Sequence, residues 1–235
     1  MAEDGSTDTA AGVPAGSIAG AASDPGRDAG GHAADGSRSG GAAGLARGLA
    51  GGAPLGLAGR AVGLREITDA ALVTIVTAER GARARLERAF DAPLPTLGLS
   101  CVTPAGERLL GLQHDRLYVL FARPRDDADP ERVLRERLGE DGRALCLNDQ
   151  SDARVTLRLD GAATRRALER VCPLDLHPDV FPVGAVARTL VEHLSAIVLR
   201  EDENVYTLLS PRSSARDFLH QIATSIRHVG GAPAA

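Results

Sequence analysis

The feature of this sequence that most constrains its fold is an internal repeat. Residues 72–90, LVTIVTAERGARARLERAF, align without a gap with residues 154–172, RVTLRLDGAATRRALERVC. Both copies begin with a strand-forming run rich in β-branched residues and pass into apolar positions at helical spacing. Val73 falls on Val155, so the offset between the copies is 155 − 73 = 82 residues. The repeat predicts two related strand–helix units.

A second pair of similar segments follows these helices. Tyr118 in HDRLYVLFARPR aligns with Tyr206 in DENVYTLLSPR, at an offset of 206 − 118 = 88 residues. In the first unit the apolar run LLGL leads directly into the polar turn QHDR. In the second unit the apolar run AIVL is followed, one residue later, by the polar turn EDEN. Apolar runs joined by a short polar turn favour a β-hairpin. We therefore expect one hairpin in each unit, with 88 − 82 = 6 extra residues ahead of the second one.

Each hairpin is followed by a helix-forming segment. In DPERVLRERL, Asp129 is placed as an N-cap and Pro130 as the first helical residue. In SSARDFLHQIATSI, the apolar residues Phe218, Ile222 and Ile226 share one helical face. Each unit is thus expected to run strand, helix, about three strands, helix. Helices on one face of largely antiparallel sheets define an α+β fold.

The N-terminal quarter of the chain has a different composition. More than half of the 27 glycines lie in the first sixty residues, among Ala, Ser, Asp and Pro. Such a segment buries too little apolar surface to offset the entropy of ordering, so we expect residues 1–58 to form a disordered tail. Residues 59–230 are expected to form one domain made of two related units, at about 62–140 and 141–228.

Composition excludes several classes of function. The formal net charge is −4, and all basic residues are arginine. A chain without lysine has no Schiff-base lysine and no phosphate-loop lysine. Acidic residues alternate with the arginines, so we expect no binding to nucleic acid. We also expect no membrane association and a cytoplasmic location, because the sequence has neither a long apolar run nor a signal-peptide pattern.

The stretch CPLDLHP, residues 172–178, lies where the second unit has its extra residues. It contains residue types found in metal sites and nucleophilic centres, but a structural zinc site needs four ligands and no second ligand pair follows. A nucleophile pair would need Cys172 held beside His177, which a proline-containing loop does not enforce. We favour a loop in which Cys172 and Leu174 anchor the chain in the core while Asp175 and His177 cap backbone groups or face a partner. No catalytic, cofactor-binding or metal-binding residue is predicted.

Two segments of the second unit carry a family resemblance. They are CPLDLHPDVFPVGAVARTLVEHLSAIVL and VYTLLSPRSSARDFLHQI. Together they resemble the C-terminal half of the gamma subunit of heterotetrameric sarcosine oxidase. The residues that recur together in that family correspond here to Cys172, Pro173, Asp175, His177, Phe181, Pro182, Thr189, Arg212 and Ser213. The resemblance is strong from about residue 145 to 226 and weaker from 62 to 144. The nine residues named above are expected to be a family motif or a subunit interface.

The resemblance implies a subunit similar in fold to the folate-binding subdomain of aminomethyltransferases, without catalytic residues of its own. It implies a complex that oxidatively demethylates sarcosine to glycine, forms hydrogen peroxide and passes the one-carbon unit to tetrahydrofolate. The large alpha subunit of that family holds FAD and NAD, the beta subunit holds covalent FMN, and the delta subunit binds zinc. The gamma subunit is expected to pack chiefly on the alpha subunit.

Two other classes of function compete with this one. The first is a stand-alone folate-binding or aminomethyltransferase-like protein, for which tight tetrahydrofolate binding by the isolated chain would be the signature. The second is a regulatory module that holds a small metabolite between its two units. Such a module would be stabilised by its ligand without any other subunit.

Overall fold

The structure is a computed structural model that describes residues 61–125, 128–143 and 145–230. Ten strands are described: β1 (Gly63–Glu66), β2 (Ala70–Val76), β3 (Ser100–Val102), β4 (Arg108–Gln113), β5 (Arg116–Ala122), β6 (Leu147–Asp149), β7 (Arg154–Asp160), β8 (Val186–Val191), β9 (Leu194–Asp202) and β10 (Val205–Pro211). The helices are α2 (Ala82–Phe90), α3 (Pro130–Arg143), α4 (Thr164–Glu169) and α5 (Ala215–Gly230), with a 3-10 turn (Arg212–Ser214) before α5. The tail predicted for residues 1–58 lies outside the described residues.

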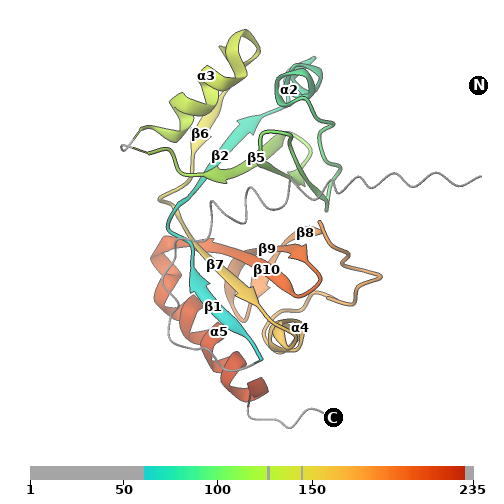
Figure 1. Cartoon of the computed structure of the whole chain (residues 1–235), viewed down its shortest axis with the longest axis vertical. Coiled ribbons are helices and arrows are strands. Elements are labelled where there is room, and N and C mark those ends of the chain that lie inside the picture. Colours follow the sequence, from blue (N-terminus) through green and yellow to red (C-terminus); the bar gives the residue numbers. More distant parts are fainter. Residues whose placement is uncertain (1–60, 126–127, 144, 231–235) are drawn as a thin grey trace, which may run out of the picture. The chain divides into compact units, whose positions relative to one another are not determined.

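The strands form two five-stranded antiparallel sheets. In sheet I the order is β3-β4-β5-β2-β6, and in sheet II it is β1-β7-β10-β9-β8. Helices α2 and α3 pack on one face of sheet I, and α4 and α5 pack on one face of sheet II (Figure 1). The predicted α+β fold is confirmed.

The central strands of both sheets are buried on both faces. Strands β2, β5, β7 and β10 each contain five consecutive buried residues, unlike a strand with one face in water. One face of each sheet packs on its helices. The opposite faces share a third core, in which Leu72 and Leu120 of sheet I belong to one buried cluster with Ile197 and Leu209 of sheet II. The two sheets are therefore held together by apolar packing.

Each sheet takes one edge strand from the other half of the chain. Strand β1 pairs with β7, where Leu64 lies opposite Leu159, and β6 pairs with β2, where Asn148 lies opposite Thr74. Counted from the exchanged strand, the orders are β1-β7-β10-β9-β8 and β6-β2-β5-β4-β3, so the elements correspond one for one. The predicted order of strand, helix, three strands and helix is confirmed. The leading strand of each unit was missed, and the predicted unit boundary near residue 140 stays a prediction.

The hairpin alignment between the units needs a correction. Tyr118 lies in the core between the sheets, whereas Tyr206 lies in the core beneath the helices, so they point to opposite faces. Gly111 in one hairpin and Arg200 in the other accept equivalent backbone hydrogen bonds, which gives an offset of 200 − 111 = 89. Thr207 therefore takes the place of Tyr118, and the predicted offset of 88 was wrong by one residue. Helices α2 and α4 do begin 82 residues apart, as predicted.

Local sequence signals predicted the start of α3 and the buried face of α5 correctly. The carboxylate of Asp129 accepts a hydrogen bond from the amide of Glu131 at 3.0 Å, so Asp129 is the predicted N-cap of α3. Phe218, Ile222 and Ile226 of α5 are buried against sheet II, as their spacing predicted. In the part of the chain that is described, no helix is both long and apolar enough to cross a membrane.

Candidate functional site

Cys172 begins the motif at the point where the chain leaves α4, and its side chain is buried. The residue is only 6% exposed, and its amide donates to the carbonyl of Leu168 at 2.9 Å. Its Sγ lies 4.0 Å from the hydroxyl of Thr189 on β8. Burial raises the pKa of the Cys172 thiol, while hydrogen bonds with the Leu174 backbone and Thr189 lower it by less. A buried, protonated thiol packs as a small apolar group and is a poor nucleophile.

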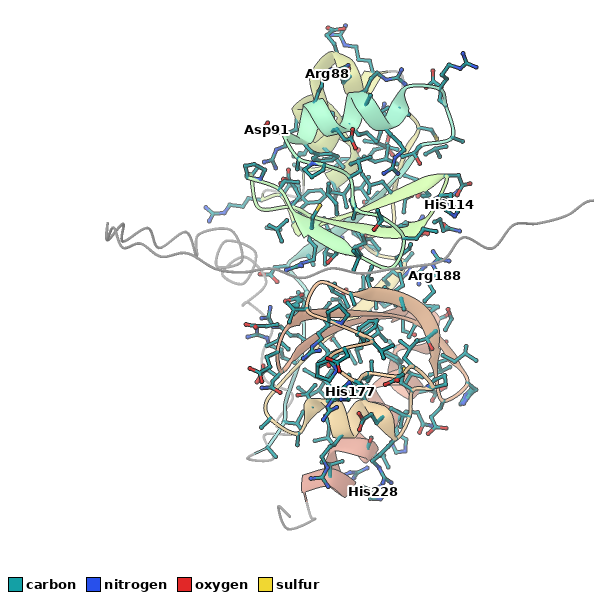
Figure 2. All side chains as sticks on the ribbon, turned by 90° about the vertical axis from the view of Figure 1, so that its right-hand side faces the viewer. Arg88, Asp91, His114, His177, Arg188 and His228 are labelled. Atoms are coloured by element: carbon teal, nitrogen blue, oxygen red, sulfur yellow. The ribbon has the colours of Figure 1, made fainter. Side chains whose placement is uncertain are left out.

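Asp175 and His177 shape the backbone of the loop. The carboxylate of Asp175 accepts a hydrogen bond from the amide of His177 at 2.9 Å. The carbonyl of His177 accepts from the amides of Val180 and Phe181 at 2.9 and 2.8 Å. The imidazole ring itself is 57% exposed and lies 3.5 Å from the carboxylate of Asp179 (Figure 2). Asp175 therefore caps the turn, as expected, while the ring of His177 faces solvent.

The loop is anchored by two side chains and one arginine. Leu176 is 1% exposed and Phe181 is 7% exposed, and both lie in the core of sheet II. The guanidinium of Arg200 donates to the carbonyl of Phe181 at 2.8 Å and lies 5.8 Å from the ring centroid of Tyr206. Leu174 is only partly buried. Leu174 packs against this core, as predicted, but Leu176, which was not predicted, is the more deeply buried aliphatic anchor.

The remaining motif residues lie at two separate positions, one near Cys172 and one beside β1. Pro173 is exposed on the same loop, and Thr189 faces Cys172 from β8. Arg212 lies elsewhere: its guanidinium pairs with the carboxylate of Glu66 on β1 at 2.9 Å. Because β1 and β8 are the two opposite edges of sheet II, Arg212 does not join the other motif residues.

Charged groups lie between the sheets, among them Glu201, which was expected in the polar turn EDEN but lies on β9. The Arg158 guanidinium is 3.0 Å from the Glu201 carboxylate, and both side chains are nearly buried. Thr207 donates its hydroxyl to the same carboxylate at 2.7 Å. Burial lowers the pKa of a second arginine, Arg108, which Glu201 attracts and Arg158 repels. One carboxylate thus balances two buried arginines.

Two further buried polar side chains, Glu107 and Tyr118, also have partners. Glu107 is 2% exposed, lies 2.6 Å from the Arg137 guanidinium and accepts a hydrogen bond from the hydroxyl of Thr103. Arg188 donates to the Tyr118 hydroxyl, and its guanidinium lies 5.2 Å from the ring centroid (Figure 2). These contacts hold carboxylates in ion pairs, which is the arrangement of structural charges rather than of a proton-transfer site.

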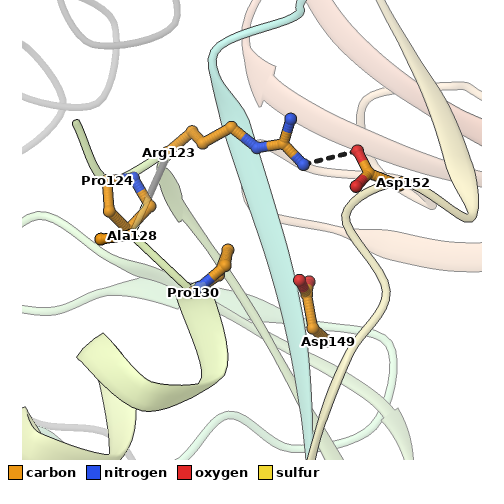
Figure 3. Close-up of a pocket in the computed structure, with 6 residues that line it drawn as sticks. All are labelled: Arg123, Pro124, Ala128, Pro130, Asp149 and Asp152. Carbon is orange, nitrogen blue, oxygen red and sulfur yellow. Dashed lines mark hydrogen bonds and ion pairs between the residues drawn. The ribbon is translucent and has the colours of Figure 1, made fainter. Parts of the chain in front are cut away.

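A polar hollow of about 240 Å³ lies where β5 ends and α3 begins (Figure 3). Its charged groups already have partners. The Arg123 guanidinium is 2.5 Å from the Asp152 carboxylate, and Asp149 accepts a hydrogen bond from the amide of Ser151 at 2.8 Å. Among the described residues, no group of three or more His, Cys, Asp or Glu side chains is placed to hold a metal ion.

The alternation in RVTLRLD indicates which face of the sheet carries Arg158, but not that this face is buried. Leu157 and Leu159 face the helices, so Arg158 between them must face the other side of the sheet. In an ordinary one-sided sheet that side would be in water, and the sequence alone gives no reason to bury it. Burial of Arg158 becomes predictable only once the second sheet is known to cover that face.

Comparison with solved structures first shows the class of fold to which this chain belongs. The fold is similar to that of a chain in the heterotetrameric sarcosine oxidase from Corynebacterium sp. U-96, solved in complex with pyrrole 2-carboxylate, with a TM-score of 0.64 and 23% identity over 81% of this chain and 95% of that chain. It is also similar to the glycine cleavage system aminomethyltransferase T from Bartonella henselae, with a TM-score of 0.53 and 16% identity over 76% of this chain and 48% of that chain. At these identities the likeness shows a shared α+β fold.

The sequence comparisons then identify the family. The sarcosine oxidase subunit gamma of Corynebacterium sp. strain P-1 is 27% identical over 183 residues, which are 77% of this chain and 87% of the relative. The model of the sarcosine oxidase, gamma subunit family matches residues 77–225. This chain therefore belongs to the sarcosine oxidase gamma subunit family. The match favours that assignment over the stand-alone aminomethyltransferase alternative.

Proposed function

We propose that this chain is the gamma subunit of a heterotetrameric sarcosine oxidase and supports the oxidative demethylation of sarcosine to glycine without supplying catalytic groups. The family match over residues 77–225 carries this proposal. The side-chain chemistry supports it, because Glu107 and Glu201 are held in ion pairs and the thiol of Cys172 is buried.

The proposed partners are the alpha, beta and delta subunits, chiefly the large alpha subunit. In this arrangement FAD, FMN, NAD, tetrahydrofolate and zinc are held by the other subunits. The proposed location is cytoplasmic. The fold shared with aminomethyltransferase T supports a place for the gamma subunit beside the part of the complex that transfers the one-carbon unit.

The motif residues take two roles in this proposal. Cys172, Phe181 and Thr189 give the loop its shape, because they pack in or against the core of sheet II. Pro173 and His177 are exposed on that loop and are available to another subunit.

The two sheets correspond to two related units that have exchanged their leading strands.

Co-expression with the genes neighbouring its own tests the proposal. An affinity tag on this chain should recover a flavoprotein, identified by mass spectrometry and by the flavin absorbance spectrum. The recovered complex should turn over sarcosine with formation of hydrogen peroxide. The chain purified alone should show neither flavin absorbance nor peroxide formation. A lone chain that oxidises sarcosine, or a tagged chain that recovers no flavoprotein, would refute the proposal.

A further inference from the structure

In the described part of the chain, most of the large exposed apolar side chains lie on two loops. Five large hydrophobic residues are exposed among the residues that the structure describes. Leu97 and Leu99 lie on the loop between α2 and β3 and are 45% and 44% exposed. Val180 and Val183 lie on the loop between α4 and β8 and are 61% and 54% exposed. Clustered exposed apolar residues on a soluble protein mark an interaction site more often than scattered ones do.

The two loops are joined by backbone hydrogen bonds. The amide of Ser100 donates to the carbonyl of Gly184 at 2.7 Å, and the amide of Val186 donates to the carbonyl of Gly98 at 2.8 Å. Gly98 and Gly184 both have positive φ, 81° and 88°, a conformation that glycine adopts without strain. We call this joined pair, residues 95–99 and 180–185, the paired-loop surface. Its backbone is fixed before any partner arrives, which lowers the entropy cost of association.

A hollow next to Leu97 adds a charge preference. It has a volume of about 420 Å³ and is lined by Arg83, Pro95, Thr96, Leu97, Gln113 and His114. Among the described residues that line it, only Arg83 and His114 are ionisable, and both are basic residue types; His114 is labelled in Figure 2. Such a hollow favours an apolar side chain that is accompanied by a carboxylate.

We propose that the paired-loop surface is the site at which this gamma subunit docks on another subunit of the heterotetramer, through a segment that carries apolar side chains beside an Asp or Glu. The inference rests on the proposed function and adds the surface and the chemistry of its partner. The basic hollow argues against a second copy of this chain as the occupant. A symmetric dimer through this surface would bring the same basic hollow from both copies to one interface.

The test is co-expression of the full-length tagged chain with the other subunits, using wild type and three variants. The double variant Leu99→Asp/Val183→Asp should lose the flavoprotein from the affinity-purified complex. Arg83→Glu should weaken association roughly tenfold at low salt, and this difference from wild type should shrink at about 0.5 M salt, because screening removes the charge term. The matched control is Leu190→Asp, which makes the same apolar-to-acidic change at a residue that is 48% exposed on β8 outside both loops. It should assemble like wild type.

Each variant purified alone should melt within a few degrees of wild type, because the altered side chains are exposed. If the double variant is folded and still assembles, the paired-loop surface is not the docking site, although the proposed function stands. Equal loss of assembly in Leu190→Asp overturns the assignment in the same way. If the isolated wild-type chain dimerises in sedimentation experiments and the double variant is monomeric, the occupant is a second copy and the proposal is wrong. A wild-type chain that recovers no flavoprotein overturns the proposed function and this inference together.

Discussion

Replacing Glu201 with glutamine is expected to destabilise this protein strongly. Glu201 is the carboxylate that balances Arg158, at 3.0 Å, and also attracts Arg108. The side chains of Arg158 and Glu201 are 11% and 7% exposed, and Arg108 is 6% exposed, so water does not screen these charges well. Glutamine keeps the size and an acceptor for Thr207 but removes the negative charge. Two arginines are then buried between the sheets without a counter-charge.

Breaking a buried ion pair from one side costs about 3–5 kcal/mol. For a domain of this size such a loss lowers the melting temperature by roughly 6–20 °C. The reverse change, Arg158→Met, is expected to cost less, about 1–2 kcal/mol, because Arg108 and the Thr207 hydroxyl still stabilise Glu201. Glu201→Gln is expected to cost more than Arg158→Met because it leaves two arginines without a carboxylate, whereas Arg158→Met leaves the carboxylate with one arginine.

Urea unfolding of the purified full-length chain, followed by far-UV circular dichroism, measures both variants. The double variant Glu201→Gln/Arg158→Met completes a double-mutant cycle and gives the coupling energy of the pair. If Glu201→Gln costs less than about 1 kcal/mol, the charges between the sheets are hydrated and the reasoning fails. An Arg158→Met variant that is less stable than Glu201→Gln would refute the claim that Arg108 shares the carboxylate.

Four other substitutions test the motif loop. Cys172→Ser should cost about 1–3 kcal/mol at pH 7, because it buries a hydroxyl in an apolar site, while assembly stays intact. Since burial raises the pKa of the Cys172 thiol above its ordinary value of 9.0, the folded wild type holds this proton more tightly than the unfolded chain, so its stability falls above that pH. The difference in free energy of unfolding between wild type and Cys172→Ser should therefore be smaller at about pH 10 than at about pH 7. An equal difference at both pH values would contradict the raised pKa of the Cys172 thiol. Leu176→Ala should cost about 2–5 kcal/mol, and Leu174→Ala less than half as much, in the same urea assay; equal costs would mean that both anchor the loop. Arg200→Met should cost about 1–3 kcal/mol and speed proteolytic cleavage within residues 172–185, because the carbonyl of Phe181 loses its donor; an unchanged cleavage rate would exclude this role for Arg200.

The parts of the fold that were predictable from sequence are those fixed by local chemistry. The polar turns and apolar runs specified both hairpins, and Asp129 with Pro130 marked the start of α3. The internal repeat predicted that these elements occur twice in the same order. The turn and cap signals act over a few residues, and the repeat compares one segment with another. None of these signals requires knowledge of tertiary contacts.

The parts that were missed depend on contacts between distant segments. Strands β1 and β6 are short, and their pairing partners are far along the chain, so no nearby turn specifies them. How deeply Leu174 and Leu176 each enter the core depends on the path of a loop with three prolines. The one-residue error between Tyr118 and Tyr206 has the same origin, since the correct offset follows from the hydrogen bonds that Gly98 and Gly184, outside the hairpins, donate to Gly111 and Arg200.

The exchange of β1 and β6 bears directly on the proposed docking surface. That surface takes one loop from each sheet, so it keeps a fixed shape only if the two sheets cannot move independently. The exchanged strands make each sheet depend on residues from both halves of the chain, and the shared core around Leu72, Leu120 and Leu209 fixes the faces against each other. The hydrogen bonds between Gly98 and Val186 and between Ser100 and Gly184 then close the rim. A duplicated chain thus offers a preformed surface that neither of its halves could provide alone.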